Sequence, residues 1–166
     1  MCEQVPVKEA WQEKYPEQVA CAVCAGADGQ TSIIPLGWFM QTSFRPPMCA
    51  ISVAHTRYSY ELLQETGEFV AAFPAEGSED DVLFCGTHSG RDVDKFAETG
   101  FTPVEASEVA PPLIAEARAN LECRVDGTLK TGDHTIFSGR VVAAHINREA
   151  GRRIYNMGSH RLRPLP

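Results

Sequence analysis

The stretch TSIIPLGWFMQTSFRPPMCAISV, residues 31–53, sets the architecture of the chain. It begins and ends as apolar strand material, while its middle is polar and is closed by Pro46-Pro47. We therefore expect a second and a third strand joined by a loop whose N–H groups need partners if the loop is buried. A ligand rich in acceptors would supply them, and Trp38 and Phe39 would offer a flat apolar surface to a ligand ring. The alternative is a plain hairpin between two core strands, with Trp38 in the core.

Composition limits the class of protein. A length of 166 residues suits one domain with a sizeable core, so we expect a single domain over 1–166 with an arm at 1–16 and a tail at 147–166. The net charge of -7 argues against nucleic acid as the main partner. The sequence has no long apolar run and no signal-peptide pattern at its N-terminus. We therefore expect a cytoplasmic protein with no membrane partner.

Six scattered cysteines raise the question of a metal or redox site. Cys21 and Cys24 form a C-x-x-C pair, but no second pair accompanies them at the spacing of a zinc site. On a strand, residues three apart also point to opposite faces. We expect free thiols that pack as small hydrophobic side chains, and no metal site.

Alternating and continuous apolar runs predict mostly antiparallel β-structure. We expect a strand buried on both faces at 18–26, a strand at 68–73 and a long strand at 134–146 that bends at Gly139. A strand at 120–128 should place Leu121, Cys123 and Val125 inward and Glu122, Arg124 and Asp126 outward. A last short strand is expected at 152–155.

Helices should fill the connections between these strands. Thr56 is expected to cap a helix over 57–66 that ends at Gly67. A second helix should open at Ser78, run through Phe84 and stop at Cys85-Gly86, and a third, capped by Asp92, should cover 93–99. Residues 101–119 read as irregular chain. No βαβ alternation is present, so a closed antiparallel barrel with peripheral helices fits best.

Four segments, in this order along the chain, resemble the flavin reductase-like family, which includes flavoredoxins. They are the opening stretch, HTRYSYELLQETGEFV (55–70), CGTHSGRDVDKF (85–96) and GDHTIFSGRVV (132–142). The resemblance covers about residues 15–146 and implies an FMN-binding split β-barrel with a few peripheral helices. It also implies one FMN per subunit, bound between the two barrels of a homodimer. Ser32, Pro35 and Arg140 depart from the family pattern, and Pro35 removes a backbone donor close to the expected flavin.

The resemblance and the needs of FMN together nominate the site residues. The isoalloxazine ring would lie against Leu36, Gly37 and Trp38, and Thr42 and Ser43 would offer hydroxyls to the ribityl chain or phosphate. The phosphate would be held by Thr56, Arg57, Ser59, Ser89, Arg91 and Lys95, the first three at a helix start that favours an anion. The alternatives are that Arg57 is a solvated helix residue and that Lys95 pairs with Asp92.

His134 is the candidate catalytic residue, expected to line the reactive edge of the flavin and to contact the nicotinamide. The alternative is a strand-start histidine bonded to the preceding turn. The resemblance implies hydride transfer from NAD(P)H to FMN, followed by electron transfer to free flavin, a ferric chelate or a partner protein. A second reading is an FMN-binding electron carrier without NAD(P)H turnover. A metal-thiolate role for the cysteines is a distant third.

Overall fold

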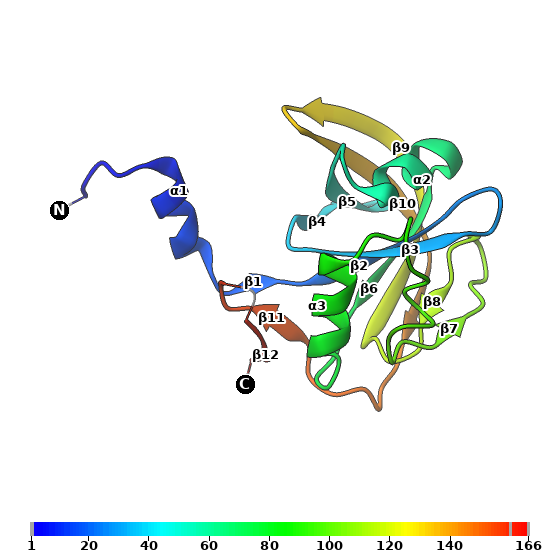
Figure 1. The fold of residues 1–166 in the computed structure, drawn as a ribbon. Helices are drawn as coiled ribbons and strands as arrows, with labels where there is room; N and C mark the ends of the chain where they lie inside the picture. The colour runs from blue at the N-terminus through cyan, green and yellow to red at the C-terminus, as the bar shows by residue number, and fades with distance from the viewer. Residues whose placement is uncertain (1, 160, 166) are drawn as a thin grey trace.

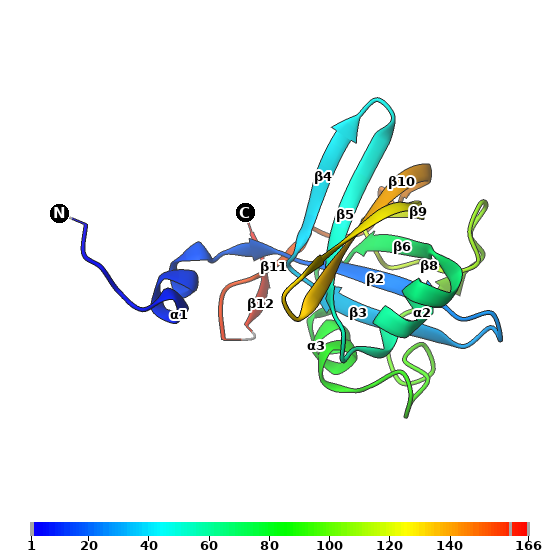
Figure 2. The same cartoon turned by 90° about the horizontal axis from the view of Figure 1, so that it is seen from above.

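The computed structural model describes residues 2–159 and 161–165, and most of them form antiparallel sheet. In these residues the body is a seven-stranded sheet of order β3-β2-β6-β9-β10-β5-β4, with every neighbouring pair antiparallel (Figures 1 and 2). The predicted fold class is confirmed. The strands are β2 (Ala20–Ala25), β3 (Thr31–Leu36), β4 (Phe39–Phe44), β5 (Pro47–Ala54), β6 (Glu68–Phe73), β9 (Ala119–Thr131) and β10 (His134–Ile146).

Strand β2 lies between two hydrophobic clusters and is buried at all six positions, as predicted. Cys21 and Val23 belong to a cluster that includes Val82 and Phe101, and Cys24 belongs to one that includes Phe69. The small side chains of β2 let both clusters approach the sheet closely. The two cysteines therefore pack on opposite faces, as free thiols.

Strand β4 corrects the prediction for the opening stretch, which contains three strands rather than two. Phe39 pairs with Ile51 and Phe44 with Pro47, so β4 and β5 form a hairpin that projects from the body (Figure 2). The strand was missed because its middle is exposed on both faces and shows no apolar alternation. Trp38 is 42% exposed, so the alternative that placed it in the core is also wrong.

Helix α2 (Tyr58–Thr66) buries Leu62 and Leu63 and ends at Gly67, which has a left-handed φ of 65°, as expected. The predicted cap is wrong: Arg57 is the N-cap residue, and no side chain of the described residues caps this end. A turn in which the N–H of Arg57 bonds to the carbonyl of Ala54 leaves Thr56 exposed, one position before the cap.

Helix α3 (Glu79–Thr87) ends just beyond its predicted stop at Cys85-Gly86. The helix predicted over 93–99 is wrong, because this segment consists of turns. Asp94, rather than Asp92, accepts bonds there from the N–H groups of Phe96 and Ala97. Residues 101–119 are mostly irregular, as expected, with two short strands, β7 (Pro103–Val104) and β8 (Leu113–Ile114).

Strands β9 and β10 form a long hairpin in the interior of the seven-stranded sheet. Their register shifts next to Gly139, where we expected the bend. The predicted outward position of Glu122 is wrong: its side chain is fully buried, because the 107–109 segment covers that face and donates N–H groups to its carboxylate.

The two ends of the chain meet in a second small sheet (Figure 1). Strand β1 (Glu17–Gln18) pairs with β11 (Ile154–Asn156), which pairs with β12 (Leu162–Pro164). The arm before β1 holds helix α1 (Val7–Ala10) and the 3-10 turn η1 (Trp11–Lys14). Within residues 2–159 and 161–165, no helix has the length and apolar character needed to cross a membrane.

Candidate functional site

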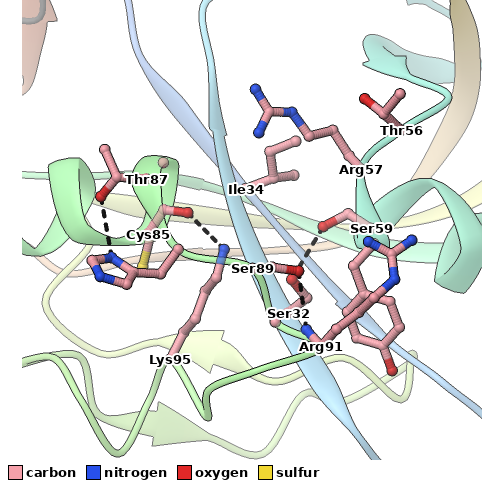
Figure 3. A pocket seen from close by; sticks show the side chains of 14 residues that line it. Ser32, Ile34, Thr56, Arg57, Ser59, Cys85, Thr87, Ser89, Arg91 and Lys95 are labelled. Carbon is pink, nitrogen blue, oxygen red and sulfur yellow. Dashed lines mark hydrogen bonds between the residues drawn. The ribbon is translucent and has the colours of Figure 1, made fainter.

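A cavity of about 190 Å³ lies where the start of α2 and the end of α3 face β3 (Figure 3). It brings together six predicted phosphate-side residues from segments about 30 positions apart: Thr56, Arg57, Ser59, Ser89, Arg91 and Lys95. Among the described residues, three cations and no carboxylate line this cavity. In a chain with a net charge of -7, this local charge favours an anion.

Arg57 occupies the centre of a longer groove. It also lines a cavity of about 280 Å³ with Leu36, Gly37, Trp38 and His134. A third cavity of about 510 Å³, mostly apolar, opens on Arg57 beside Val82, Leu83, Asn156 and Leu162 of α3 and the C-terminal strands. The groove therefore joins a cationic end to an aromatic and apolar end.

The guanidinium of Arg57 has no hydrogen-bond or ion-pair partner in the part of the chain that the structure describes. It stands directly before the first turn of α2, where the N–H groups of Tyr58 and Ser59 have no partner within the helix. The N–H groups of Ser89 and Gly90, on the opposite wall, also make no backbone hydrogen bond within residues 2–159 and 161–165. Such donors fit a phosphate.

Ser59 forms part of the wall of the cavity. Its buried hydroxyl donates to the hydroxyl of Ser32, over 3.3 Å. Gly90 packs on the same serine, since a Cβ at Gly90 would lie 2.5 Å from the Ser32 Oγ. These contacts fix the loop after α3 against β3.

Arg91 lies at the rim of the cavity, where a carboxylate partly neutralises it. Its Nη2 lies 2.5 Å from Oε1 of Glu61, and the guanidinium lies over the ring of Tyr58. Ser89 accepts a bond from the N–H of Arg91 through its hydroxyl, which shapes the turn. An incoming anion would compete with Glu61 for Arg91.

Lys95 is buried, with 4% of its surface exposed. Its ammonium donates to the carbonyls of Ile33 and Cys85, each at 2.6 Å. The expected alternative, an ion pair with Asp92, is wrong, since the ammonium points inward. Burial lowers the pKa of Lys95 and raises that of the Cys85 thiol to about 11.

His134 and Trp38 form the aromatic end of the groove, with ring centroids 4.7 Å apart. The His134 Nδ1 lies 2.6 Å from Oδ1 of Asp133, and this hydrogen bond lowers the pKa of Asp133. The histidine thus contacts the preceding turn and also lines the cavity. The arm also contacts Trp38. The ring centroids of Trp11 and Trp38 are 6.4 Å apart, and Nζ of Lys14 lies 5.8 Å from the Trp38 ring centroid.

Thr42 and Ser43 do not join the other predicted residues. They lie on the projecting β4–β5 hairpin, outside the three cavities that meet at Arg57. The remaining residues that line the first cavity were not predicted as site residues: Ser32, Ile34, Tyr58, Cys85, Gly86, Thr87, His88 and Gly90. The small residues of the CGTHSG run could have indicated several of them, because small residues allow a ligand to approach the backbone closely.

Comparison with known proteins places the chain among flavoproteins. A family model described as "Flavin reductase like domain" matches residues 13–165. An uncharacterized protein of Archaeoglobus fulgidus is 39% identical over 111 residues, which are 67% of this chain and 63% of that protein. The match thus spans less than two thirds of the length of that relative.

Three solved structures superimpose over nearly the whole chain. The NADH:FAD oxidoreductase SgcE6 of Streptomyces globisporus C-1027 is 26% identical, with a TM-score of 0.85 and coverage of 100% of this chain and 99% of that one. An FMN-binding protein of Thermus thermophilus, with bound p-hydroxybenzaldehyde, is 25% identical, with a TM-score of 0.83 and coverage of 98% and 93%. A protein with a split barrel domain, from Shewanella frigidimarina NCIMB 400, has a TM-score of 0.85 at 12% identity, with coverage of 98% and 90%, and confirms the predicted split barrel.

Proposed function

The chain belongs to the flavin reductase-like family, and from this premise we propose that it binds FMN and reduces it with NAD(P)H, passing the electrons to a second acceptor. The observation that carries the proposal is the groove centred on Arg57, which joins a cationic cavity to an aromatic one. The neighbours named above include an FMN-binding protein and an NADH:FAD oxidoreductase, which supports a flavin and a nicotinamide substrate.

The donors of the first cavity fit the phosphate of FMN. Arg57 supplies a guanidinium that no described side chain engages, and the α2 start supplies free N–H groups. The ring would lie toward Leu36, Gly37 and Trp38, which offer apolar cover and backbone groups. The phosphate end has room for a small anionic group and is closed on one side by Ser59, Ser32 and Gly90.

Bound FMN would supply the hydride-accepting and electron-passing chemistry, so the protein has to bind, orient and exclude water. His134 lies at the rim of the aromatic cavity, where a side chain can hold the nicotinamide close to the flavin. Asp133 restrains the His134 ring through the 2.6 Å contact. The electron acceptor, whether free flavin, a ferric chelate or a protein, would approach the flavin at this aromatic cavity, as the nicotinamide does.

Rapid mixing with NADH and NADPH tests the proposal. We expect the purified protein to bind FMN and the visible absorbance of the flavin to disappear on mixing with at least one of the two nucleotides. A protein that binds FMN, stays oxidised with both nucleotides and is reduced only chemically would be an electron carrier. Failure to bind added FMN would overturn the proposal as a whole.

Substitution of His134 separates positioning from binding. His134→Ala should keep FMN affinity but slow flavin reduction by about tenfold, since a lost positioning contact removes part of the near-attack alignment. Asp133→Asn is the matched variant, because it removes only the charge that restrains the ring. If a folded His134→Ala protein reduces FMN at the wild-type rate, then His134 has no role in positioning.

A further inference from the structure

Lys95 carries a buried positive charge that no carboxylate of the described residues balances. The ammonium lies between β3 and the last turn of α3, bonded to the carbonyls of Ile33 and Cys85 at 2.6 Å each (Figure 3). Within residues 2–159 and 161–165, no acidic side chain forms an ion pair with it. Burying a charge is costly unless an opposite charge or full hydrogen bonding compensates for it.

The two carbonyls that Lys95 bonds belong to two elements that border the cationic cavity. Ile33 belongs to β3, and Cys85 lies in the last turn of α3, just before the loop of residues 88–91 that carries Ser89 and Gly90. Lys95 itself follows this loop, so its ammonium ties both ends of the loop to β3. An ammonium has three donors and only two are used by these carbonyls, and Lys95 also lines the cavity.

We propose that Lys95 is a positioning residue of the anion site: its ammonium holds the end of α3 and the 88–91 loop against β3, and an anion in the cavity supplies the missing counter-charge. The inference rests on the proposed function, because the anion would be the phosphate of FMN. It assigns to Lys95 a role in the free protein as well as in the complex. A direct ligand alone would have no such role.

The proposal makes anion affinity depend on pH. Burial lowers the pKa of Lys95, the Cys85 thiol acts in the opposite direction and Arg57 adds to the lowering. Cys21 and Cys24 on β2 also face the ammonium, but burial raises the pKa of both thiols, that of Cys24 to about 12, so they stay neutral. A bound phosphate favours the charged form, so affinity should fall as pH rises through the pKa of Lys95 in the free protein.

The ratio of FMN to riboflavin affinity isolates this effect, because both ligands share the ring and its own titration cancels. In the wild type, we expect the preference for FMN to fall about tenfold as pH rises from about 7, above the second ionisation of phosphate, through the lowered pKa of Lys95. Lys95→Met should show a smaller preference at neutral pH and no such decline. Lys130→Met, at an exposed position near the end of β9, is the control and should behave as wild type.

A wild-type pH profile in Lys95→Met would overturn the inference while leaving the proposed function intact. A wild type that binds neither flavin would instead overturn the proposed function. Should Lys95→Met fail to fold, the wild type itself gives the test, because the chain has four lysines, Lys8, Lys14, Lys95 and Lys130.

Nitrogen-15 labelling of these lysines allows each ammonium to be titrated by NMR. One lysine should titrate below the other three, and inorganic phosphate should move that titration upward. Four coincident titrations, or no response to phosphate, would overturn the inference.

Discussion

Three cations line one cavity, yet their partners give them different roles. Within the described part of the chain Arg57 has no ion-pair partner, Arg91 forms an ion pair with Glu61, and Lys95 donates to two carbonyls. The sequence grouped them as equivalent phosphate ligands because all three belong to family-like segments. Their differences come from Glu61, Ile33 and Cys85, which local sequence could not assign as partners. We therefore expect Arg57 to contribute most of the direct charge to phosphate binding.

Arg57→Ala should weaken FMN binding by about 1.5–3 kcal/mol, the usual value of a charge-assisted hydrogen bond. Riboflavin, which lacks the phosphate, should bind the variant and the wild type almost equally. Calorimetric titration with both ligands gives the comparison, with Arg140→Ala on the exposed face of β10 as the control. Equal loss of both ligands would mean that Arg57 supports the fold rather than the phosphate.

Glu122 is predicted to make the protein sensitive to acid. Desolvation raises the pKa of this buried carboxyl, but bonds from Ser107, His145 and Glu108 outweigh it and lower the pKa to about 2. A lowered carboxyl pKa stabilises the fold above the unfolded value of 4.5, and this stability is lost as pH falls toward about 2. The shift corresponds to about 3 kcal/mol at most.

Urea unfolding at several pH values measures this contribution. Between about pH 5 and pH 2 the wild type should lose stability steeply, whereas Glu122→Gln should start lower and decline less. Glu116→Gln, which removes the charge of a carboxylate bonded to the N–H of Thr102, is the control. Parallel pH profiles for wild type and Glu122→Gln would contradict the assignment.

At the scale of elements, prediction succeeded where burial left a periodic trace. The strand β2 and the long strand β10 were expected because apolar or alternating residues mark them. Strand β4 left no such trace, since Met40, Gln41 and Thr42 are all exposed, and β5 is the strand with which it pairs. Alternation along the strand predicts that Glu122 faces solvent. In the fold the 107–109 segment covers it, and the local sequence of the strand does not show this contact.

Gly139 should be indispensable to the packing of β10. A Cβ there would lie 2.8 Å from Cε1 of Phe69 and 3.2 Å from the Cβ of Cys123, in a core with no spare room. Gly139→Ala should therefore destabilise the fold by about 1–3 kcal/mol, as overpacking does. Gly127→Ala on β9 is the matched control, because no atom of the described residues lies within 4 Å of the position that its methyl group would take. A thermal midpoint unchanged in Gly139→Ala would show that Phe69 can move aside.

At the scale of the whole molecule, the resemblance anticipated more of the site than periodicity did. It placed the 55–70 and 85–96 segments on one site, and the structure brings both to the same cavity. It also nominated Thr42 and Ser43, which lie outside this chain's own groove because their hairpin projects from the body (Figure 2). In a dimer, such a hairpin could reach a second copy.

We propose that the chain forms a homodimer with FMN at the subunit interface. An apolar hollow of about 560 Å³ lies against the sheet, and residues of β4, β5, β6, β9 and β10 line it, among them Phe39, Met48, Phe73 and Val142. On the adjoining hairpin, Phe44 is 82% exposed. A continuous apolar face of this kind usually marks an interface, and two-fold pairing is the commonest way to cover it.

Sedimentation of the wild type should therefore show about twice the chain mass of 18.2 kDa. Ala144→Asp should shift the protein to monomer, because the exposed Ala144 lines the apolar hollow and a charge there would be desolvated on pairing. Val104→Asp, on the exposed strand β7 outside this hollow, is the control and should remain dimeric. If the interface completes the site, the Ala144→Asp monomer should also lose FMN affinity. A monomeric wild type would contradict the dimer, and a monomeric variant that binds FMN normally would place the whole site within one chain.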